Sequence, residues 1–524
     1  MQVLLVLARE PGQVVSRRDL EAEVWAGRVV TDDAVTNTIG KLRKALHDNP
    51  RQPQFIETIA KSGYRLKVEP QPAPADDPAP TVAPTGGAGW RRRGMLQAIG
   101  AVLLGALVLS VVSVIWYSPE PPGTPVPQGR AEASIAVIPF DVLGDDPAQA
   151  YFAEGITLDL ITELSRFPEL LVIAPGSVFG YRETSADDRA IAAELGVRYL
   201  IRGGVQRLGD RVRINVRLLQ AERGLTLWAE RFVGQVGSFF QMQEQVVRGI
   251  TSALPEHLAL SGRPITRSGA TDSIAAYDEF LRGLERYGRR TPEDNRTARA
   301  HFEQAIALDP EFARAYAGLA LAWSRLAIDG WTADPELALS KAAAFTDRAA
   351  AIDPSVPQIH FVRGQVALFE GEHERAAAAA TRAIELDPNY ADAYALLAWI
   401  LHYAGRPDQA ERALAEALRR NPKASASYDQ IAGEIQFATG HYEEAVKAFE
   451  AALARNPAHT RARLWLAAAL AQLGRTEDAA WEVQELLAIN PDLSLSRLLL
   501  AFPLKDPRQR DALASALTRL GLPQ

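Results

Sequence analysis

A repeat of about 34 residues in the second half of the chain constrains its fold more than any other feature. The end of each repeat carries a proline preceded by Asp or Asn, and a glycine marks the turn inside each repeat. The prolines are Pro354, Pro388, Pro422, Pro457 and Pro491, and the glycines are Gly371, Gly405, Gly440 and Gly474. Alanine-rich units of this length form helix pairs that bury their apolar side only by stacking on neighbours. We therefore expect residues 273–524 to form a helical solenoid.

These units resemble tetratricopeptide (TPR) repeats in the segments FEQAIALDP, ATRAIELDPNYADAYALLAWILHYAGRPDQA and FEAALARNP. The resemblance implies a concave groove that binds a protein or peptide partner, and a scaffold without a ligand is the alternative. From Pro310 to Pro354 the spacing stretches to 44 residues, which predicts an inserted turn around Gly330, Trp331 and Thr332. Five aromatic residues are expected in the core or the groove: Tyr394, Trp399, Tyr403, Tyr428 and Phe437.

A second feature is the uncharged segment 95–117, which follows three arginines at 91–93 and ends in Trp116 and Tyr117. A bilayer core needs about 20 apolar helical residues, and flanking arginines stay in the cytoplasm. We expect a single transmembrane helix in a bacterial inner membrane, with the N-terminus cytoplasmic and the C-terminus periplasmic. A signal peptide is disfavoured because some ninety residues precede the segment. A buried core helix is disfavoured because Pro-rich stretches bound it.

Composition fits a mostly globular chain with linkers. Apolar residues make up 47% and the net charge is −7. The absence of cysteine excludes disulfides, thiolate catalysis and Cys-based metal sites. Residues 69–94 are a Pro- and Ala-rich linker, and a shorter one spans residues 118–133.

The N-terminal residues predict two helices followed by a hairpin. Ser16 with Asp19 resembles an N-cap and its acidic partner. Val35, Ile39, Leu42 and Leu46 form the core-facing stripe of a second helix, whose other faces are polar and cationic. Residues 55–59 and 64–68 read as strands joined across a tip that carries a lysine.

This region resembles the winged helix-turn-helix of OmpR/PhoB-type regulators in EPGQVVSRRDLEAEVW, IGKLRKAL and FIETIAKSGYRL. The resemblance implies that residues 1–68 bind double-stranded DNA, with the helix from 32 to 47 in the major groove. Lys41 would lie near bases, Arg43 and Thr58 on phosphates, and the wing around Lys61 beside the backbone. The predicted DNA-binding residues are Thr36, Asn37, Lys41, Arg43, Lys44, Thr58 and Lys61.

The start of this domain departs from the family. Such domains open with a small antiparallel sheet, whereas Met1 falls inside the first expected helix. We therefore expect an N-terminally truncated winged helix without its initial sheet. The missing sheet would leave Val3, Leu4 and Leu7 partly uncovered.

Residues 134–258 predict an α/β domain with a mixed sheet. The segments SIAVIPF, YFAEGIT, ELGVRYLIRGGV and LWAERF resemble the TolB-like amino-terminal domain, which occurs with TPR arrays in bacterial membrane regulators and beside some adenylyl cyclase catalytic domains. Asp159 and Glu163 lie one helical turn apart, which is typical of a solvated helix face. The sequence contains no P-loop lysine motif, His-Glu-x-x-His or Gly-x-Ser-x-Gly. We expect no enzyme activity, no cofactor and no metal.

Together these patterns predict a membrane-anchored transcriptional regulator that resembles the CadC and ToxR class, with an extracytoplasmic TolB-like and TPR sensor. Its expected partners are DNA, the inner membrane, a protein or peptide in the TPR groove, and a second copy of the chain. Ala101 and Gly105 would allow close helix packing in such a dimer. One alternative is a periplasmic assembly scaffold whose DNA-binding domain is a degenerate tether. Another is a regulatory partner of an enzyme encoded elsewhere.

Overall fold

The computed structural model contains two compact units, Met1–Gln128 and Gly129–Gln524. In the first unit it describes residues 2–9, 12–16, 19–20, 24, 38–39, 42–43, 48, 54–59 and 63–68. In the second it describes residues 133–144, 149–182, 187–255, 268–423, 425–489 and 503–522.

The prediction of a membrane-spanning helix is corrected by the structure. Among the helices that the structure describes, none combines the length and the apolar character that crossing a membrane requires. Residues 95–117, where the prediction fell, lie outside the described residues. The fold class is therefore a winged-helix region, an α/β domain and a helical TPR solenoid, and the predicted single-pass inner-membrane localisation is not retained.

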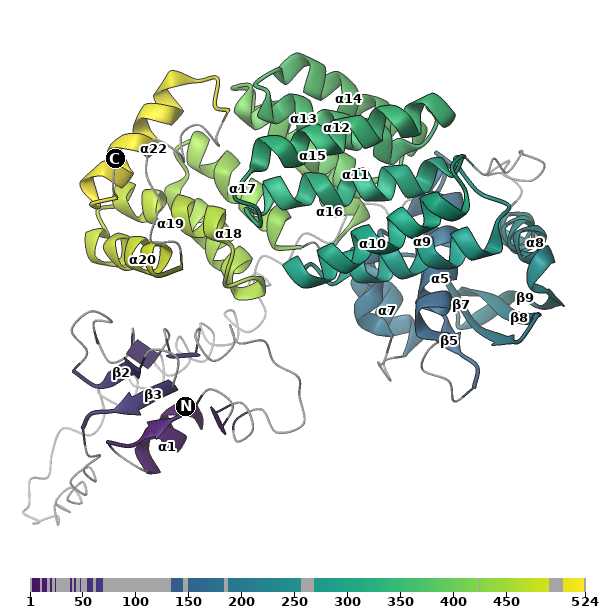
Figure 1. Ribbon diagram of the computed structural model, residues 1–524, viewed down its shortest axis with the longest axis horizontal. Helices are drawn as coiled ribbons and strands as arrows, with labels where there is room; N and C mark the ends of the chain where they lie inside the picture. Colours follow the sequence, from purple (N-terminus) through teal and green to yellow (C-terminus); the bar gives the residue numbers. More distant parts are fainter. Residues whose placement is uncertain are drawn as a thin grey trace, which may run out of the picture. The chain divides into compact units, whose positions relative to one another are not determined.

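The first unit contains helix α1 (Gln2–Arg9) and strands β1 (Val14–Val15), β2 (Ile56–Ile59) and β3 (Gly63–Leu66) (Figure 1). The strands form an antiparallel sheet in the order β1-β3-β2. The predicted cap at Ser16 is confirmed, because its hydroxyl accepts the Asp19 N–H at 3.1 Å and donates to the Asp19 carboxylate at 2.7 Å. This reciprocal pair fixes where the chain turns into a helix.

The apolar side of α1 is covered. Val3 and Leu7 are 1% and 0% exposed and pack with Leu20, Ile39 and Ile56. The prediction that Val3 and Leu7 would be partly uncovered is therefore wrong, while Leu4 is half-buried as expected. The described helices and strands of this unit supply enough apolar surface to bury the two residues.

The second unit begins with the α/β domain, whose mixed sheet has the strand order β6-β4-β7-β8-β9, with β5 also pairing with β7. These strands are β4 (Ser134–Val137), β5 (Asp141–Val142), β6 (Leu171–Val172), β7 (Tyr199–Leu208), β8 (Arg211–Gln220) and β9 (Leu225–Gln235). β4 runs parallel to β6 and β7, whereas β7, β8 and β9 are antiparallel. Gly209 and Gly224 supply the positive φ at the two hairpin turns.

Helices accompany this sheet: α5 (Ala150–Ser165), α6 (Pro175–Val178), α7 (Asp188–Leu195) and α8 (Phe239–Ala253), with short 3-10 turns η2 (Phe179–Tyr181) and η3 (Val236–Ser238). Every residue of β4 is buried, as expected for a central parallel strand. The predicted mixed-sheet layer is present.

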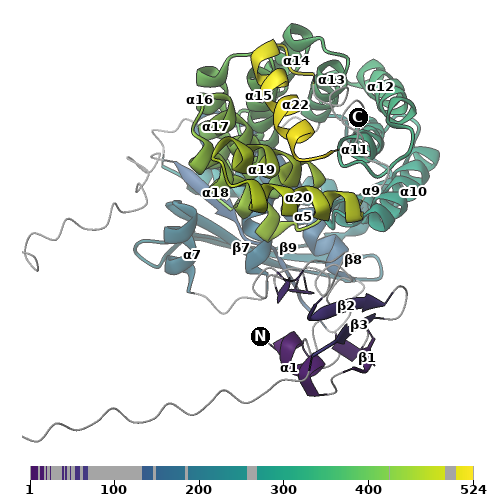
Figure 2. The same ribbon diagram turned by 90° about the vertical axis from the view of Figure 1, so that its left-hand side faces the viewer.

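The rest of the second unit is the TPR array, whose helix pairs follow one another along an arc (Figure 2). The pairs are α9 (Ile274–Gly288) with α10 (Pro292–Leu308), α11 (Ala313–Ile328) with α12 (Pro335–Ile352), α13 (Pro357–Phe369) with α14 (His373–Leu386), α15 (Ala391–Tyr403) with α16 (Pro407–Arg420), α17 (Ala426–Ala438) with α18 (Tyr442–Arg455), and α19 (Thr460–Gln472) with α20 (Thr476–Ile489). Helix α22 (Pro507–Arg519) follows. Small buried residues such as Ala380, Ala417 and Ala452 allow the helices to pack closely.

The long repeat between Pro310 and Pro354 does not arise from an inserted turn alone. Helix α11 has 16 residues and α12 has 18, whereas α13 and α14 of the next pair have 13 and 14. The turn around Gly330 accounts for only part of the extra length. Both helices of this pair are longer instead.

Candidate functional site

The first candidate site is the predicted DNA interface, of which the structure describes Arg43 and Thr58. Arg43 is 7% exposed. Its guanidinium donates to the Ile56 carbonyl oxygen at 2.9 Å and to the Thr58 hydroxyl at 2.7 Å. Arg43 therefore does not lie on the exposed helix face that its position in the sequence predicts.

Asp48 completes this arrangement and was not predicted. It is fully buried, and its carboxylate accepts the backbone N–H groups of Gln54 and Ile56, both at 2.6 Å. Since β2 is an edge strand, Arg43 and Asp48 satisfy the backbone groups of Ile56 that no neighbouring strand can reach. They fix the position of β2, which leads to the predicted wing.

Thr58 is exposed beside Arg43 and Asp48, so its side chain is available to solvent. The other predicted DNA-binding residues lie outside the described residues: Thr36, Asn37, Lys41, Lys44 and Lys61. Their roles stay predictions.

The second candidate site lies in the other unit, where the α/β domain packs against the TPR array. The Asn389 amide, 5% exposed, donates to the carbonyl oxygens of Ser165 and Leu170 at 3.0 and 2.9 Å. Its oxygen accepts the Val172 N–H at 3.1 Å. Nearby, the Ser177 hydroxyl donates to the Asn421 amide oxygen at 2.6 Å. The end of α5 and the start of α6 are thus held by the array.

Asp159 strengthens the same junction. Its carboxylate, 5% exposed on α5, pairs with Arg314 of α11 at 2.5 Å and accepts the hydroxyl of Tyr277 of α9. Gln243 of α8 donates to it at 3.1 Å. Burial raises the pKa of Tyr277 well above its ordinary value, so its hydroxyl remains a donor. The expectation that Asp159 lies on a solvated helix face is wrong, because the array covers this face of α5.

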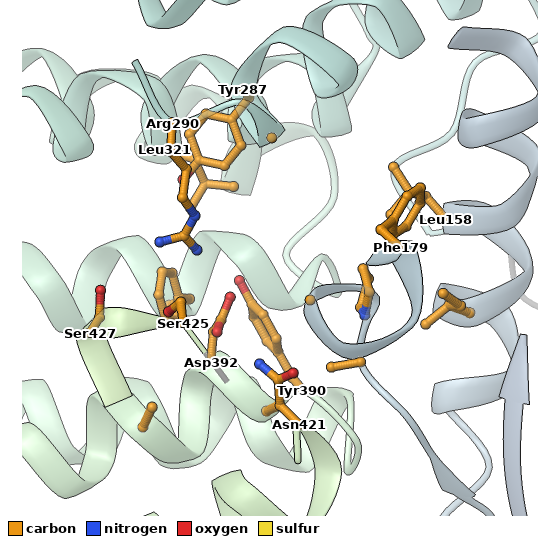
Figure 3. A pocket seen from close by; sticks show the side chains of 18 of the residues that line it. Leu158, Phe179, Tyr287, Arg290, Leu321, Tyr390, Asp392, Asn421, Ser425 and Ser427 are labelled. Atoms are coloured by element: carbon orange, nitrogen blue, oxygen red, sulfur yellow. The ribbon is translucent and has the colours of Figure 1, made fainter. Parts of the chain in front are cut away.

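A cavity of about 1000 Å³ remains between the α/β domain and the array. Figure 3 shows Arg290 and Tyr287 on one wall, Tyr390, Asp392 and Ser425 on another, and residues of α5 and η2 on a third. The first helices of the pairs α9 to α17 line it. Cavities of this size hold small ligands or parts of a peptide.

The C-terminal segment contacts another part of the array. The backbone N–H of Lys505 donates to the Tyr403 carbonyl at 2.9 Å. The His373 imidazole meets the Pro503 carbonyl oxygen at 2.6 Å. The C-terminal segment therefore packs against the ends of α14 and α15.

Beside the cavity lies a buried polar cluster on α15 and α17. Glu434 is fully buried and accepts the Trp399 indole N–H at 3.2 Å and the Gln430 amide at 2.5 Å. His402, also fully buried, lies 3.6 Å from the Glu434 carboxylate. Burial raises the pKa of Glu434 to about 7 and lowers the pKa of His402 to about 3. Burial thus shifts both groups toward their neutral forms.

The aromatic residues predicted for the core or groove divide between these roles. Tyr403 and Phe437 are buried in the array. Trp399 and Tyr428 are buried and also line the cavity, and Tyr428 donates to Asp392 at 2.7 Å. Tyr394 is half-buried beneath the Arg420 guanidinium, 4.2 Å from its ring centroid. Within the described residues, no cluster of His, Asp and Glu has a metal-binding arrangement.

Comparison with known protein families supports the assignments of the N-terminal region and of the repeat region. Residues 1–66 match the model of the C-terminal domain of transcriptional regulatory proteins. Residues 333–391, 367–435 and 432–494 match tetratricopeptide repeat models. The chain therefore carries a transcriptional-regulator DNA-binding domain and TPR repeats.

Individual proteins are similar over parts of the chain. The putative adenylate cyclase 3 of Rhizobium meliloti is 36% identical over 245 residues, which are 46% of this chain and 42% of that protein. The cholera toxin transcriptional activator of Vibrio cholerae is 42% identical over 67 residues, 12% of this chain and 23% of that protein. The chain thus spans less than half the length of these curated relatives. A solved thermophilic TPR protein of Thermus thermophilus is 21% identical over 37% of this chain and 99% of its own, with a TM-score of 0.30.

Proposed function

We propose that this protein regulates transcription by binding double-stranded DNA through residues 1–68, and that its TPR-containing unit binds a protein partner that controls this activity. The observation that carries the proposal is the match of residues 1–66 to a regulator DNA-binding domain on the same chain as a TPR array. The likeness to the cholera toxin transcriptional activator supports the same reading.

In this proposal, Lys41 and Lys44 contact DNA from the recognition helix and Lys61 contacts the backbone from the wing. Arg43 acts mainly by positioning β2, because its guanidinium is already bonded to Ile56 and Thr58. Contacts to phosphate set affinity and register, whereas contacts to base edges set specificity. A second copy of the chain would supply the second half-site, since one winged helix reads only one.

The partner would bind the parts of the array that the α/β domain and the C-terminal segment leave accessible. A partner controls DNA binding only if its affinity differs between two states of the protein. We also propose that this chain is not an enzyme, because its sequence contains no P-loop lysine motif, no His-Glu-x-x-His and no Gly-x-Ser-x-Gly. Its similarity to a putative adenylate cyclase would then reflect a shared regulatory segment.

The test is DNA binding by the full-length chain and its variants. A duplex enriched from a random-sequence pool serves as the probe, and fluorescence anisotropy gives the affinity. Lys41→Ala should weaken binding about ten- to a hundredfold if Lys41 reads a base. Lys341→Ala, the same change at an exposed position of α12, is the matched control and should have no effect. Equal affinities of wild type and Lys41→Ala would refute the DNA-contact assignment.

A further inference from the structure

The first TPR helix pair differs from the next five at one backbone position. The residue directly after the C-cap of each pair's first helix has a left-handed backbone. In five pairs this residue is glycine, with φ between 70° and 82°: Gly330, Gly371, Gly405, Gly440 and Gly474. In the first pair it is Arg290, with φ 57°, which in the described part of the chain is the one residue other than glycine with a positive φ.

An arginine at this position has a cost that glycine would avoid, because a side chain disfavours the left-handed region. Strained residues of this kind concentrate at ligand-binding positions, where the surrounding structure maintains them. Replacing Arg290 by glycine would relieve the strain and match the other turns. Its presence therefore points to a role for the side chain.

The side chain of Arg290 extends into the cavity (Figure 3). Within the described residues, its guanidinium makes no hydrogen bond or direct ion pair and is exposed to solvent, and its positive charge acts on nearby Asp329, which also lines the cavity. The remaining cations that line the cavity are each bonded within the chain: Arg182 to Glu154, Arg289 to Glu285, Arg325 to the Tyr287 carbonyl, and Lys423 to Glu194. Arg290 is thus the cation available to an anionic ligand.

The side chains that line the cavity around Arg290 indicate which chemical groups the rest of a ligand would carry. Ser425 and Ser427 provide hydroxyl groups near it, whereas Leu158 and Phe179 provide apolar surface on the α/β side (Figure 3). Asp392 also lines the cavity and faces the same space. A nearby carboxylate disfavours a doubly charged anion more than a singly charged one. The cavity therefore suits one negative charge joined to an apolar body.

We propose that this cavity binds a small amphipathic monocarboxylate, whose carboxylate pairs with Arg290 and whose apolar part packs against Leu158 and Phe179. A guanidinium matches a carboxylate through two parallel N–H···O bonds. The site lies between the α/β domain and the array and is formed by both, so its occupancy would depend on how the two are docked. Ligand binding in this cavity does not require DNA binding by the first unit.

A fluorescent probe tests it: 11-(dansylamino)undecanoate, titrated into the full-length chain, with its methyl ester as the uncharged counterpart. Wild type should bind the carboxylate more tightly than the ester. Arg290→Gly should weaken carboxylate binding about ten- to a hundredfold and leave ester binding unchanged. Because glycine occupies the equivalent turns, this variant should fold at least as well as wild type, which thermal melting checks.

The control is Arg296→Ala, which removes an exposed arginine of α10 that pairs with Glu293 and is not part of the cavity lining, and it should leave probe binding unchanged. Unlabelled decanoate should displace the probe at lower concentration than decyl phosphate does. The proposal is overturned if wild type fails to bind the probe, if Arg290→Gly binds it as wild type does, or if the ester binds as tightly as the carboxylate. More effective displacement by decyl phosphate would overturn the assignment to a monocarboxylate.

Discussion

Replacing Asn389 by alanine should loosen the attachment of the α/β domain to the TPR array. The change removes two donated hydrogen bonds, to Ser165 and Leu170, and one accepted from the Val172 N–H. Asn389 is 5% exposed, so water does not readily replace these bonds in the docked state. Each buried backbone group left unpaired costs about 1–3 kcal/mol. Three such groups give an expected loss of about 3 kcal/mol or more in the free energy of docking.

The assay is amide hydrogen exchange, followed in peptides that cover residues 168–174. A single melting temperature is poorly defined for a chain with several domains, whereas exchange reports local opening. A loss of about 3 kcal/mol corresponds to roughly a hundredfold faster exchange of the Val172 amide. Asn456→Ala, at an exposed position of the array where the side-chain oxygen accepts the Ala458 N–H, is the control and should leave this segment unchanged.

Unchanged exchange of the Val172 amide in Asn389→Ala would refute the reasoning. It would mean that other contacts of the junction, such as the Asp159–Arg314 pair, hold the domain without Asn389.

Two further changes test other parts of the structure. Arg43→Met should lower the local stability of the N-terminal unit by about 1.5–3 kcal/mol, because the buried Ile56 carbonyl loses its donor. Amide hydrogen exchange in peptides that cover β2 and β3 measures this loss. Unaltered stability with weakened DNA binding would show that Arg43 acts on DNA instead. Burial raises the pKa of Glu434 to about 7, so the folded state binds its proton more tightly than the unfolded state does. The free energy of unfolding should therefore rise as the pH falls from 8 to 6.5. This rise should be about 1 kcal/mol larger in wild type than in Glu434→Gln. Amide hydrogen exchange in peptides that cover α17, compared between the two proteins at each pH, measures this difference, and an equal pH dependence in the two proteins would contradict it.

Much of the fold follows from periodic patterns in the sequence. The 34-residue spacing of prolines and glycines predicts the helix pairs, since each glycine ends a helix with a positive φ. The Ser16 cap is likewise local, because its partner Asp19 lies three residues away. Such signals need no knowledge of distant contacts.

The site residues that were missed depend on distant contacts. Asp159 and Arg314 are separated by 155 residues, and Val172 and Asn389 by 217. The helical pattern in the sequence identifies the polar face of α5, but it cannot show that the TPR array covers this face. For that reason the sequence predicted that Asp159 is exposed to solvent. The burial of Arg43 could not be predicted for the same reason, because its partner is the backbone of an edge strand. Arg290 did leave a signal: its repeat lacks the glycine that the next five repeats carry.

Sequence-specific DNA binding is the central claim, and one comparison tests it most directly. The full-length chain is titrated with a duplex enriched from a random pool and with a scrambled duplex of the same length and composition, at about 150 mM salt. We predict that the enriched duplex binds at least about a thousandfold more tightly than the scrambled one. Equal affinity for the two duplexes, or no binding to either, would contradict it.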